Sequence, residues 1–429
     1  MSTATDIEQT GTASAAPWSL RRVVTAGVIG NVLEWYDFAV YGFFAPILAA
    51  RFFPGDDPRV SLLAAFGAFA VGFLMRPVGA VLFGHIGDRY GRARALLLSI
   101  AMMAVPTVLM GLLPTYETIG MAASLLIVVL RMCQGVAVGG EFTSSIVFLG
   151  EHAPPERRGF FSSFAVFGAT MGTMLGSAVG ALLTNVMSPE ALAAWGWRAA
   201  FISGIAVAVV GALIRRGMFD APAAAAGHSP VRLALQRHRR QVLRVLALNV
   251  AAAATYYSLF VFAATWLAQT TTIDRAAALD ATTITILTFL VVLPLAAWAS
   301  DRIGRRAVLM LGLGGCLAAA YPLLALMHTG HLVGATLAQM AFAAVLAIQM
   351  AAIPAAMCEM FPHAVRVSAV SVGYGLAYAL FGGTAPAVAV WLIGVTGSDV
   401  AFAWYLMGLT LVSLAVAAGI EDGHGKPLS

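Results

Sequence analysis

The stretch that decides the fold is GHIGDRYGRAR, residues 84–94, a short basic loop between two runs of apolar residues. A reduced copy, DRIGRR, stands at residues 301–306, again between apolar runs. A second motif is also repeated: Glu151 and Arg158 of EHAPPERRG correspond to Glu359 and Arg366 of CEMFPHAVR. Because two motifs recur in the same order, the chain is predicted to consist of two halves of similar design joined head to tail.

The composition around these loops excludes a soluble protein. Of the 429 residues 60% are hydrophobic and 10% are charged, and the mean hydropathy is +0.87. Such a chain has too little polar surface for a soluble globule and is predicted to be an integral membrane protein. The net charge of +5 does not indicate nucleic acid, since the basic residues lie in short loops without interleaved aromatic residues. The three cysteines show no metal-ligand spacing, so no metal site is predicted.

Apolar runs of the length that a membrane helix needs, about 20 residues, fill most of the chain. Twelve such runs occur, at 23–48, 61–84, 95–113, 119–149, 160–184, 196–214, 245–269, 278–299, 306–327, 331–359, 367–395 and 400–419. The predicted fold is an all-α integral membrane protein with twelve transmembrane helices in two pseudo-symmetric six-helix bundles. The predicted divisions are a tail at 1–22, a bundle at 23–214, a linker at 215–244, a bundle at 245–419 and a tail at 420–429.

The distribution of arginine predicts the orientation. Short loops rich in Lys and Arg stay in the cytoplasm, and the arginines gather on alternate connections between the predicted spans. The opposite side holds only Arg51, Arg59, Arg198 and Arg275. Both termini are therefore predicted to be cytoplasmic.

Several motifs in fixed order resemble the major facilitator superfamily. The loops after the second and eighth spans are similar to its GxxxDRxGRR pattern, although Ala297 stands where the second copy usually begins with Gly. Within the superfamily, NVLEWYDF (31–38), FLMRPVGA (73–80), RMCQGVAVGGEF (131–142) and WGWR (195–198) resemble the metabolite:proton symporter family. This resemblance covers nearly the whole chain.

The resemblance implies a function in the bacterial inner membrane. Members of the family import citrate, 2-oxoglutarate, shikimate, proline or betaine together with protons. For this chain it implies a small-molecule substrate and protons as partners, a functional monomer in the lipid bilayer, no nucleic acid and no cofactor, with the proton gradient as the driving force. A mono-, di- or tricarboxylate is the first substrate class expected, and a zwitterionic osmolyte such as proline or betaine is the alternative.

Ionisable residues inside the predicted spans mark the candidate coupling site, because a charge in the bilayer core costs at least about 2.5–3.5 kcal/mol. Glu34 and Asp37 are three residues apart and share a helix face. Two carboxylates so close do not both ionise easily, which makes them a candidate proton site. Arg131 on the fourth span either neutralises one carboxylate or grips an anionic substrate. The predicted proton-coupling residues are therefore Glu34, Asp37 and Arg131.

Other features of the first half are interpreted as structural or left open. Arg76 beside Pro77 is predicted to snorkel or to bind carbonyl groups that the proline frees. Glu141 fits function and packing equally well. The fifth span carries glycines at four-residue spacing, which allow close helix approach and are predicted to form a sliding contact between the halves. These glycines are Gly168, Gly172, Gly176 and Gly180.

Polar and aromatic residues of several spans are predicted to complete a substrate site. Aromatic rings, Trp266 among them, can hold the cation of a zwitterion. The candidate substrate contacts are Arg131, Tyr41, Asn249, Tyr256, Tyr257, Gln349, Tyr374 and Tyr378.

By resemblance to the superfamily, the repeated loops form a cytoplasmic gate, a charge cluster that holds one state closed and breaks when the protein opens inward. The predicted gate residues are Gly84, Asp88, Arg89, Arg92, Glu151, Arg158, Asp301, Arg302, Arg305, Glu359 and Arg366.

Three other functions are weighed against proton symport. A uniporter or exchanger would leave Glu34 and Asp37 as structural charges. A non-transporting membrane sensor would need a soluble signalling domain, and no loop is long enough for one. An intramembrane enzyme would need a catalytic motif, and Gly-x-Ser-x-Gly, a phosphate loop and metal-ligand spacing are not recognised.

Overall fold

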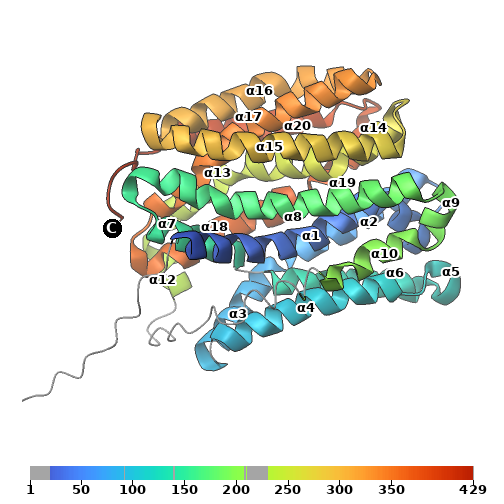
Figure 1. Cartoon of the computed structure of the whole chain (residues 1–429), viewed down its shortest axis with the longest axis horizontal. Coiled ribbons are helices and arrows are strands. Elements are labelled where there is room, and N and C mark those ends of the chain that lie inside the picture. The colour runs from blue at the N-terminus through green and yellow to red at the C-terminus, as the bar shows by residue number, and fades with distance from the viewer. Residues whose placement is uncertain (1–19, 91, 139–140, 207–208, 210–229, 429) are drawn as a thin grey trace, which may run out of the picture.

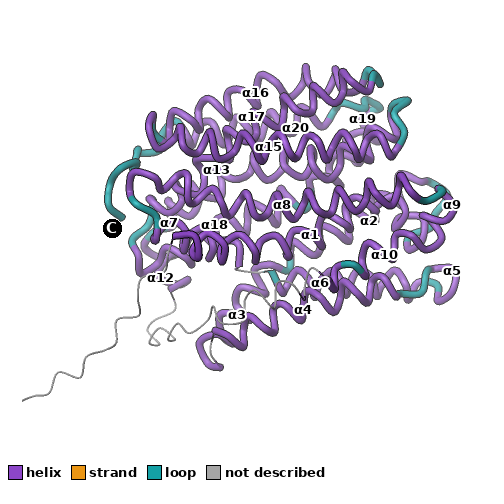
Figure 2. The backbone as a smooth tube through the Cα atoms, viewed as in Figure 1, coloured by secondary structure: helices purple, strands orange, loops and turns teal. Residues whose placement is uncertain are grey.

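The computed structural model describes residues 20–90, 92–138, 141–206, 209 and 230–428. These residues form helices joined by short loops, with no strand among them (Figures 1 and 2). The predicted N-terminal tail and most of the predicted linker at 215–244 lie outside the described residues, while the described part of the linker holds a short helix and the first turns of the next one.

The elements of the first half are α1 (Leu20–Phe52), α2 (Pro58–Leu74), α3 (Arg76–Tyr90), α4 (Arg92–Leu112), α5 (Tyr116–Ile119), α6 (Met121–Ala137), α7 (Glu141–His152), η1 (Pro155–Arg157), α8 (Arg158–Val186), α9 (Pro189–Ala191), η2 (Leu192–Gly196) and α10 (Trp197–Ile202). The elements of the second half are α12 (Pro230–Arg237), α13 (Arg239–Tyr257), η3 (Ser258–Phe262), α14 (Ala263–Thr270), α15 (Arg275–Ile303), α16 (Arg305–His328), α17 (Leu332–Glu359), η4 (His363–Val365), α18 (Arg366–Ala377), η5 (Tyr378–Gly382), α19 (Ala385–Thr396) and α20 (Phe402–Ala417).

The helices have the length and composition of membrane spans. Among the described residues, eight helical segments are long and apolar enough to cross a bilayer, and Ala101–Leu112 and Phe402–Ala417 are shorter apolar helices. Together with α1 and the segment from η2 to α10, they confirm the predicted all-α fold of twelve membrane helices.

The second, seventh and eleventh spans are not continuous α-helices. The second span breaks at Met75, where Pro77 enters the first turn of α3 and supplies no backbone N–H. The seventh and eleventh spans each contain a π-helical segment, η3 and η5. Such segments inside α-helices are frequent at functional sites, and these two carry or adjoin Tyr256, Tyr257 and Tyr378.

The two halves lie side by side with their helices roughly parallel to one long axis, and α8 of the first half runs along α15 of the second (Figure 1). A hydrogen bond of 2.7 Å between the hydroxyls of Ser177 and Thr283 joins α8 to α15 across the interface between the halves. The buried apolar residues form one cluster that extends through both halves.

Three of the four α8 glycines, Gly168, Gly172 and Gly176, face α1 and not the second half, so the predicted sliding contact is wrong for them; a Cβ at Gly180 would meet α1 and also Leu279 of α15. A Cβ added at Gly172 would lie 2.3 Å from the carbonyl oxygen of Val32, and one at Gly168 would lie 2.6 Å from that of Val28. The stripe therefore packs α8 against α1 inside the first half. A helix offers several faces, and here the hydroxyl-bearing face of α8 meets the second half instead.

Candidate functional site

One end of the bundle carries the repeated arginine-containing loops and the C-terminal segment, and is called here the arginine-rich end. At this end Glu359, the last residue of α17, accepts bonds from two buried arginines. Arg158 of α8 lies 3.0 Å from Glu359 Oε1, and Arg305 of α16 lies 3.2 Å from the same oxygen. The Arg158 pair crosses from the first half to the second, so it holds the halves together at this end.

Asp301 of the second motif copy makes a second bridge between the halves. Its two carboxylate oxygens accept the backbone N–H groups of Gly159 and Phe160, each at 2.8 Å, at the start of α8. A carboxylate is favourable at the positive end of a helix dipole. Arg305 holds the same carboxylate at 2.7 Å, and Gly304, with φ of +95°, makes the turn that places Arg305 there.

Residues of the second repeated motif also join the two halves, since Arg366 of α18 forms an ion pair with Glu151 of α7. Of the predicted gate residues, Arg302 does not join the cluster: it is exposed and lies over the ring of Trp298, 3.8 Å from the centroid. The structure does not describe the side chains of four other predicted gate positions, Gly84, Asp88, Arg89 and Arg92. The side chain of Glu141 is likewise outside the described part.

The C-terminal segment packs into the same cluster. Arg158 donates to the carbonyl oxygen of Lys426 at 3.0 Å, and Asp422 accepts the backbone N–H of Arg305 at 3.0 Å and that of Arg306 at 3.4 Å. Burial disfavours the charged form of Asp422, but the hydrogen bonds from Arg305, His424 and Arg306 outweigh it and hold the pKa of Asp422 below its ordinary value.

Hydrogen bonds from Arg275 and Asn185 join the two halves at the opposite end. Arg275 at the start of α15 donates to the carbonyl oxygen of Phe43 in α1 at 2.6 Å, and Asn185 of α8 lies 3.3 Å from Asp280 of α15. A cavity of about 90 Å³ lies beside Arg275, lined from both halves. Both ends of the interface between the halves are therefore closed by specific contacts.

Between the two ends, Glu34 of α1 forms a buried ion pair with Arg76 of α3. The Arg76 Nη2 to Glu34 Oε1 distance is 2.9 Å, and both side chains are 5% exposed. The guanidinium also lies 4.7 Å from the centroid of the Phe73 ring. The prediction that Arg76 snorkels is therefore wrong. The break at Met75 turns α3 so that Arg76 faces α1, where the carboxylate compensates its charge.

Asp37 has different partners. It accepts a hydrogen bond of 2.8 Å from the hydroxyl of Thr107 on α4. Gln134 of α6 donates to the same hydroxyl at 2.7 Å, and Arg131 donates to the Gln134 amide oxygen at 2.7 Å. Among the described residues, hydrogen bonds connect Arg131 to Asp37 through these two neutral side chains, and none joins the two groups directly.

Close backbone contacts set this geometry. A Cβ at Gly135 would lie 1.8 Å from the carbonyl oxygen of Gly72, and one at Gly79 would lie 1.9 Å from that of Val136. Only glycine allows α6 to approach α2 and α3 so closely. The approach places the Arg131 guanidinium over three rings, 4.6 Å from Phe38, 4.4 Å from Tyr41 and 5.2 Å from Phe69.

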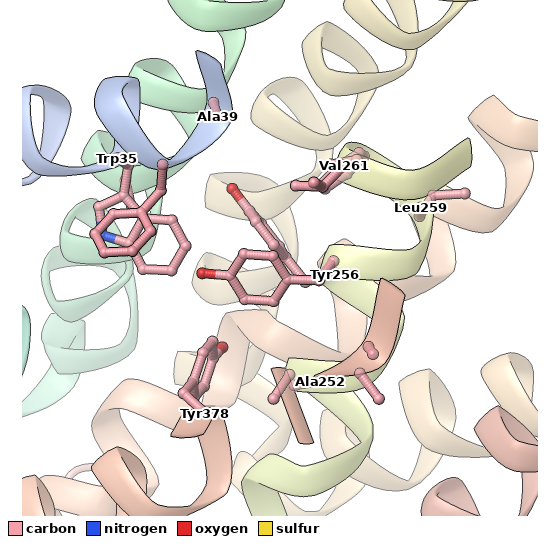
Figure 3. Close-up of a cluster of buried hydrophobic side chains, with 14 of the residues drawn as sticks. Trp35, Ala39, Ala252, Tyr256, Leu259, Val261 and Tyr378 are labelled. Atoms are coloured by element: carbon pink, nitrogen blue, oxygen red, sulfur yellow. The ribbon is translucent and has the colours of Figure 1, made fainter. Parts of the chain in front are cut away.

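An aromatic cluster joins this region to the second half (Figure 3). Trp35 of α1 lies 5.7 Å from Tyr256, 5.9 Å from Tyr257 and 6.4 Å from Tyr378, measured between ring centroids. Tyr378 stacks on Tyr374 at 4.0 Å. The structure thus brings four predicted substrate contacts together around Trp35, a residue that the sequence reasoning did not single out.

Several buried hydrogen-bond donors in this region have no hydrogen-bond partner among the described residues. They are Nε1 of Trp35, Nε of Arg76, Nε and Nη2 of Arg131, and the hydroxyl of Tyr257. The aromatic contacts connect them, since Tyr257 touches Trp35 and also Phe73, 5.0 Å away, whose ring lies under Arg76. Buried donors normally find acceptors. This region therefore has the chemistry to bind an acceptor-rich group.

The remaining predicted contacts are occupied or lie apart. Tyr41 donates to the carbonyl oxygen of Ala65 at 3.0 Å, and Asn249 donates to that of Val245 at 2.8 Å. Gln349 is buried, and neither of its amide atoms has a partner among the described residues. Trp266 donates to the carbonyl oxygen of Asp399 at 2.8 Å and stacks on His328, away from the central tyrosines.

Two residues of the site, Thr107 and Gln134, were missed because they carry no charge. Gln134 had a usable signal, since it follows Arg131 by three positions and so shares its helix face. Thr107 lies on a span without any ionisable residue in its middle, and only the fold places it beside Asp37.

Comparison with known proteins agrees with this architecture. The profile of the family described as "Sugar (and other) transporter" matches residues 23–223 and again 217–419. The proline/betaine transporter of Salmonella typhimurium is 32% identical over 95% of this chain and 85% of its own length. The shikimate transporter of Escherichia coli is 35% identical over 94% of this chain and 95% of its own, and the alpha-ketoglutarate permease of Escherichia coli is 34% identical over 93% of each.

A solved structure has the same fold. The major facilitator superfamily proton:xylose symporter, bound to 6-bromo-6-deoxy-D-glucose, superposes with a TM-score of 0.74 at 17% identity and covers 95% of this chain and 97% of its own. On the family profile, the relatives and the fold, this chain belongs to the sugar (and other) transporter family of the major facilitator superfamily, whose members are transporters and not enzymes.

Proposed function

We propose that this protein imports a small organic metabolite that bears a carboxylate, together with a proton, across the bacterial inner membrane. The observation that carries the proposal is the set of buried donors without acceptors around Trp35, Arg76, Arg131 and Tyr257. A carboxylate accepts several hydrogen bonds and compensates the charge of a guanidinium. Its binding would satisfy donors that are costly to leave unpaired.

Proton coupling is assigned to Glu34, Asp37 and Arg131. Glu34 already has the cation of Arg76 beside it, whereas the hydrogen-bond partner of Asp37 is a neutral hydroxyl. Asp37 is therefore the proposed proton carrier. Glu34 is proposed to change partners when a substrate carboxylate reaches Arg76.

Transport follows from rocking of the two proposed bundles, 23–214 and 245–419, around this midplane region. The arginine-rich end is proposed to face the cytoplasm, with both termini on that side, since short basic loops stay there. The proton gradient is proposed to drive the cycle without a cofactor, and the proposed functional unit is a monomer.

A second candidate substrate class is a zwitterionic osmolyte. The aromatic cluster favours it, because the rings of Trp35, Tyr256, Tyr257 and Tyr378 have faces that can hold a cation while an arginine holds the carboxylate. Relatives named for proline and betaine and relatives named for shikimate and alpha-ketoglutarate are similar to this chain at comparable identity.

The test is the internal pH of proteoliposomes that hold the purified protein. Citrate, 2-oxoglutarate, shikimate, proline and glycine betaine are added outside in turn, and acidification inside with one of them is expected. Glu34→Gln and Asp37→Asn are expected to abolish proton-driven accumulation of that compound while the proteins stay folded. Exchange of a labelled compound without proton movement would make the protein a uniporter or exchanger, and full accumulation in both variants would remove the coupling assignment.

A further inference from the structure

The hydrogen bonds between Asp37 and Arg131 form a chain through two neutral residues on different helices. Thr107 belongs to α4 and Gln134 to α6, and both are at most 1% exposed. The distances along the chain are 2.8 Å from Asp37 to Thr107, 2.7 Å from Thr107 to Gln134 and 2.7 Å from Gln134 to Arg131. All three hydrogen bonds are buried.

Counting donors and acceptors fixes the direction of two links. A guanidinium only donates, so Gln134 must turn its amide oxygen to Arg131 and its NH₂ group to Thr107. The Thr107 oxygen therefore accepts from Gln134. Its single hydrogen remains for one of two acceptors, each at 2.8 Å: Asp37 Oδ2 or the carbonyl oxygen of Met103.

This arrangement satisfies Asp37 in both of its protonation states. When Asp37 is ionised, the Thr107 hydroxyl donates to the carboxylate in a charge-assisted bond. When a proton binds at Oδ2, the new O–H donates to the second lone pair of the Thr107 oxygen, and the Thr107 hydrogen rotates to the Met103 carbonyl. The only covalent bond that forms is the O–H bond of Asp37.

We propose that Thr107 and Gln134 are positioning residues of a hydrogen-bond relay that holds Asp37 in either protonation state while Gln134 keeps its bond to Arg131. This inference rests on the proposed role of Asp37 as proton carrier. Among the described residues, the titratable and charged groups that interact with Asp37 are Tyr36 of α1 and Arg131 of α6, while Glu34, three residues earlier on α1, is paired with Arg76 of α3. Thr107 of α4 and Gly204, which follows α10, also lie against Asp37 and carry no charge.

The relay is tested by infrared difference spectroscopy of the purified full-length protein during a pH titration, with the proton itself as the only ligand. The carbonyl stretching band of protonated Asp37 is assigned by its loss in Asp37→Asn. In Thr107→Val the band is expected to move to higher frequency, because the carboxyl group loses its partner, and its titration range is expected to change by about one pH unit. Thr107→Ser keeps the hydroxyl and is expected to restore both.

Gln134→Leu separates a relay from a simple contact. Gln134 makes no bond to Asp37, yet Gln134→Leu is expected to shift the Asp37 band. When Thr107→Val is already present, Gln134→Leu is expected to cause no further shift of the band. Additive effects of the two substitutions would overturn the relay. The control is Thr285→Val, a buried threonine of α15 whose hydroxyl has no partner among the described residues, which is expected to leave the band unchanged. Melting curves of all variants separate spectral changes from misfolding.

The outcomes also separate the relay from the proposed function. A wild-type band in Thr107→Val overturns the relay even if transport is proton-coupled. The absence of any band that is lost in Asp37→Asn overturns the relay together with the role of Asp37. A band with the expected dependence on Thr107 and Gln134 supports the relay even if no compound moves protons in proteoliposomes.

Discussion

Replacing Glu359 by Gln is expected to open the arginine-rich end. Arg158, 2% exposed, and Arg305, fully buried, both bind the same Glu359 oxygen. Removing one partner of a buried ion pair costs about 3–5 kcal/mol. Since Gln still accepts a hydrogen bond and Arg158 keeps the Lys426 carbonyl, we take the lower value. At about 1.4 kcal/mol per factor of ten, a loss of about 3 kcal/mol raises the population open at this end about 100-fold.

A native cysteine reports this opening. Cys358 of α17 is fully buried against α7 of the other half, where a Cβ at Gly150 would lie 2.9 Å from its sulfur. In a protein with Cys133→Ser and Cys316→Ser, the rate of maleimide labelling of Cys358 follows the open population when opening is fast. Glu359→Gln is therefore expected to speed labelling about 100-fold.

The matched control is Glu117→Gln, which breaks the ion pair of Glu117 with Arg51 at the opposite end. Glu117 is 75% exposed there, and exposed pairs contribute little. Its labelling rate should stay within about twofold of the parent, in keeping with the small energies of surface pairs. Unchanged labelling in a folded Glu359→Gln protein would refute the inference that these ion pairs keep this end shut. Equal acceleration in both variants would indicate general loosening instead.

Two further predictions concern stability. Gly172→Ala is expected to lower the melting temperature and to cost about 1–3 kcal/mol of folding free energy, because the new Cβ would meet the backbone of α1. Gly314 faces open space, so Gly314→Ala should be neutral or stabilising. Equal melting curves for the two variants would contradict the assigned α8–α1 contact. Asp422 has a lowered pKa, so its contribution to stability is present above the ordinary Asp pKa and is lost as the pH falls through the lowered value. The melting-temperature difference between wild type and Asp422→Asn should therefore shrink on acidification, and a difference independent of pH would contradict it.

Much of the fold followed from local chemistry. Runs of apolar residues with the length of a bilayer predicted the spans, because a membrane helix must satisfy its backbone internally whatever its neighbours are. The repeated loops predicted two halves, and Glu151, Arg158, Glu359 and Arg366 do meet across them. A charge in an apolar run is also a local signal, which is why the sequence alone could single out Glu34, Asp37 and Arg131.

The tertiary structure decided which partner each of these groups takes. Glu34 binds Arg76, hydrogen bonds connect Arg131 to Asp37 through Thr107 and Gln134, and the α8 glycines turn to α1. The helical period fixes which residues share a face, but it does not fix how one helix is rotated against the next. That rotation depends on where backbones can approach, as α6 does on α2 and α3, and this is a property of all the packed helices together.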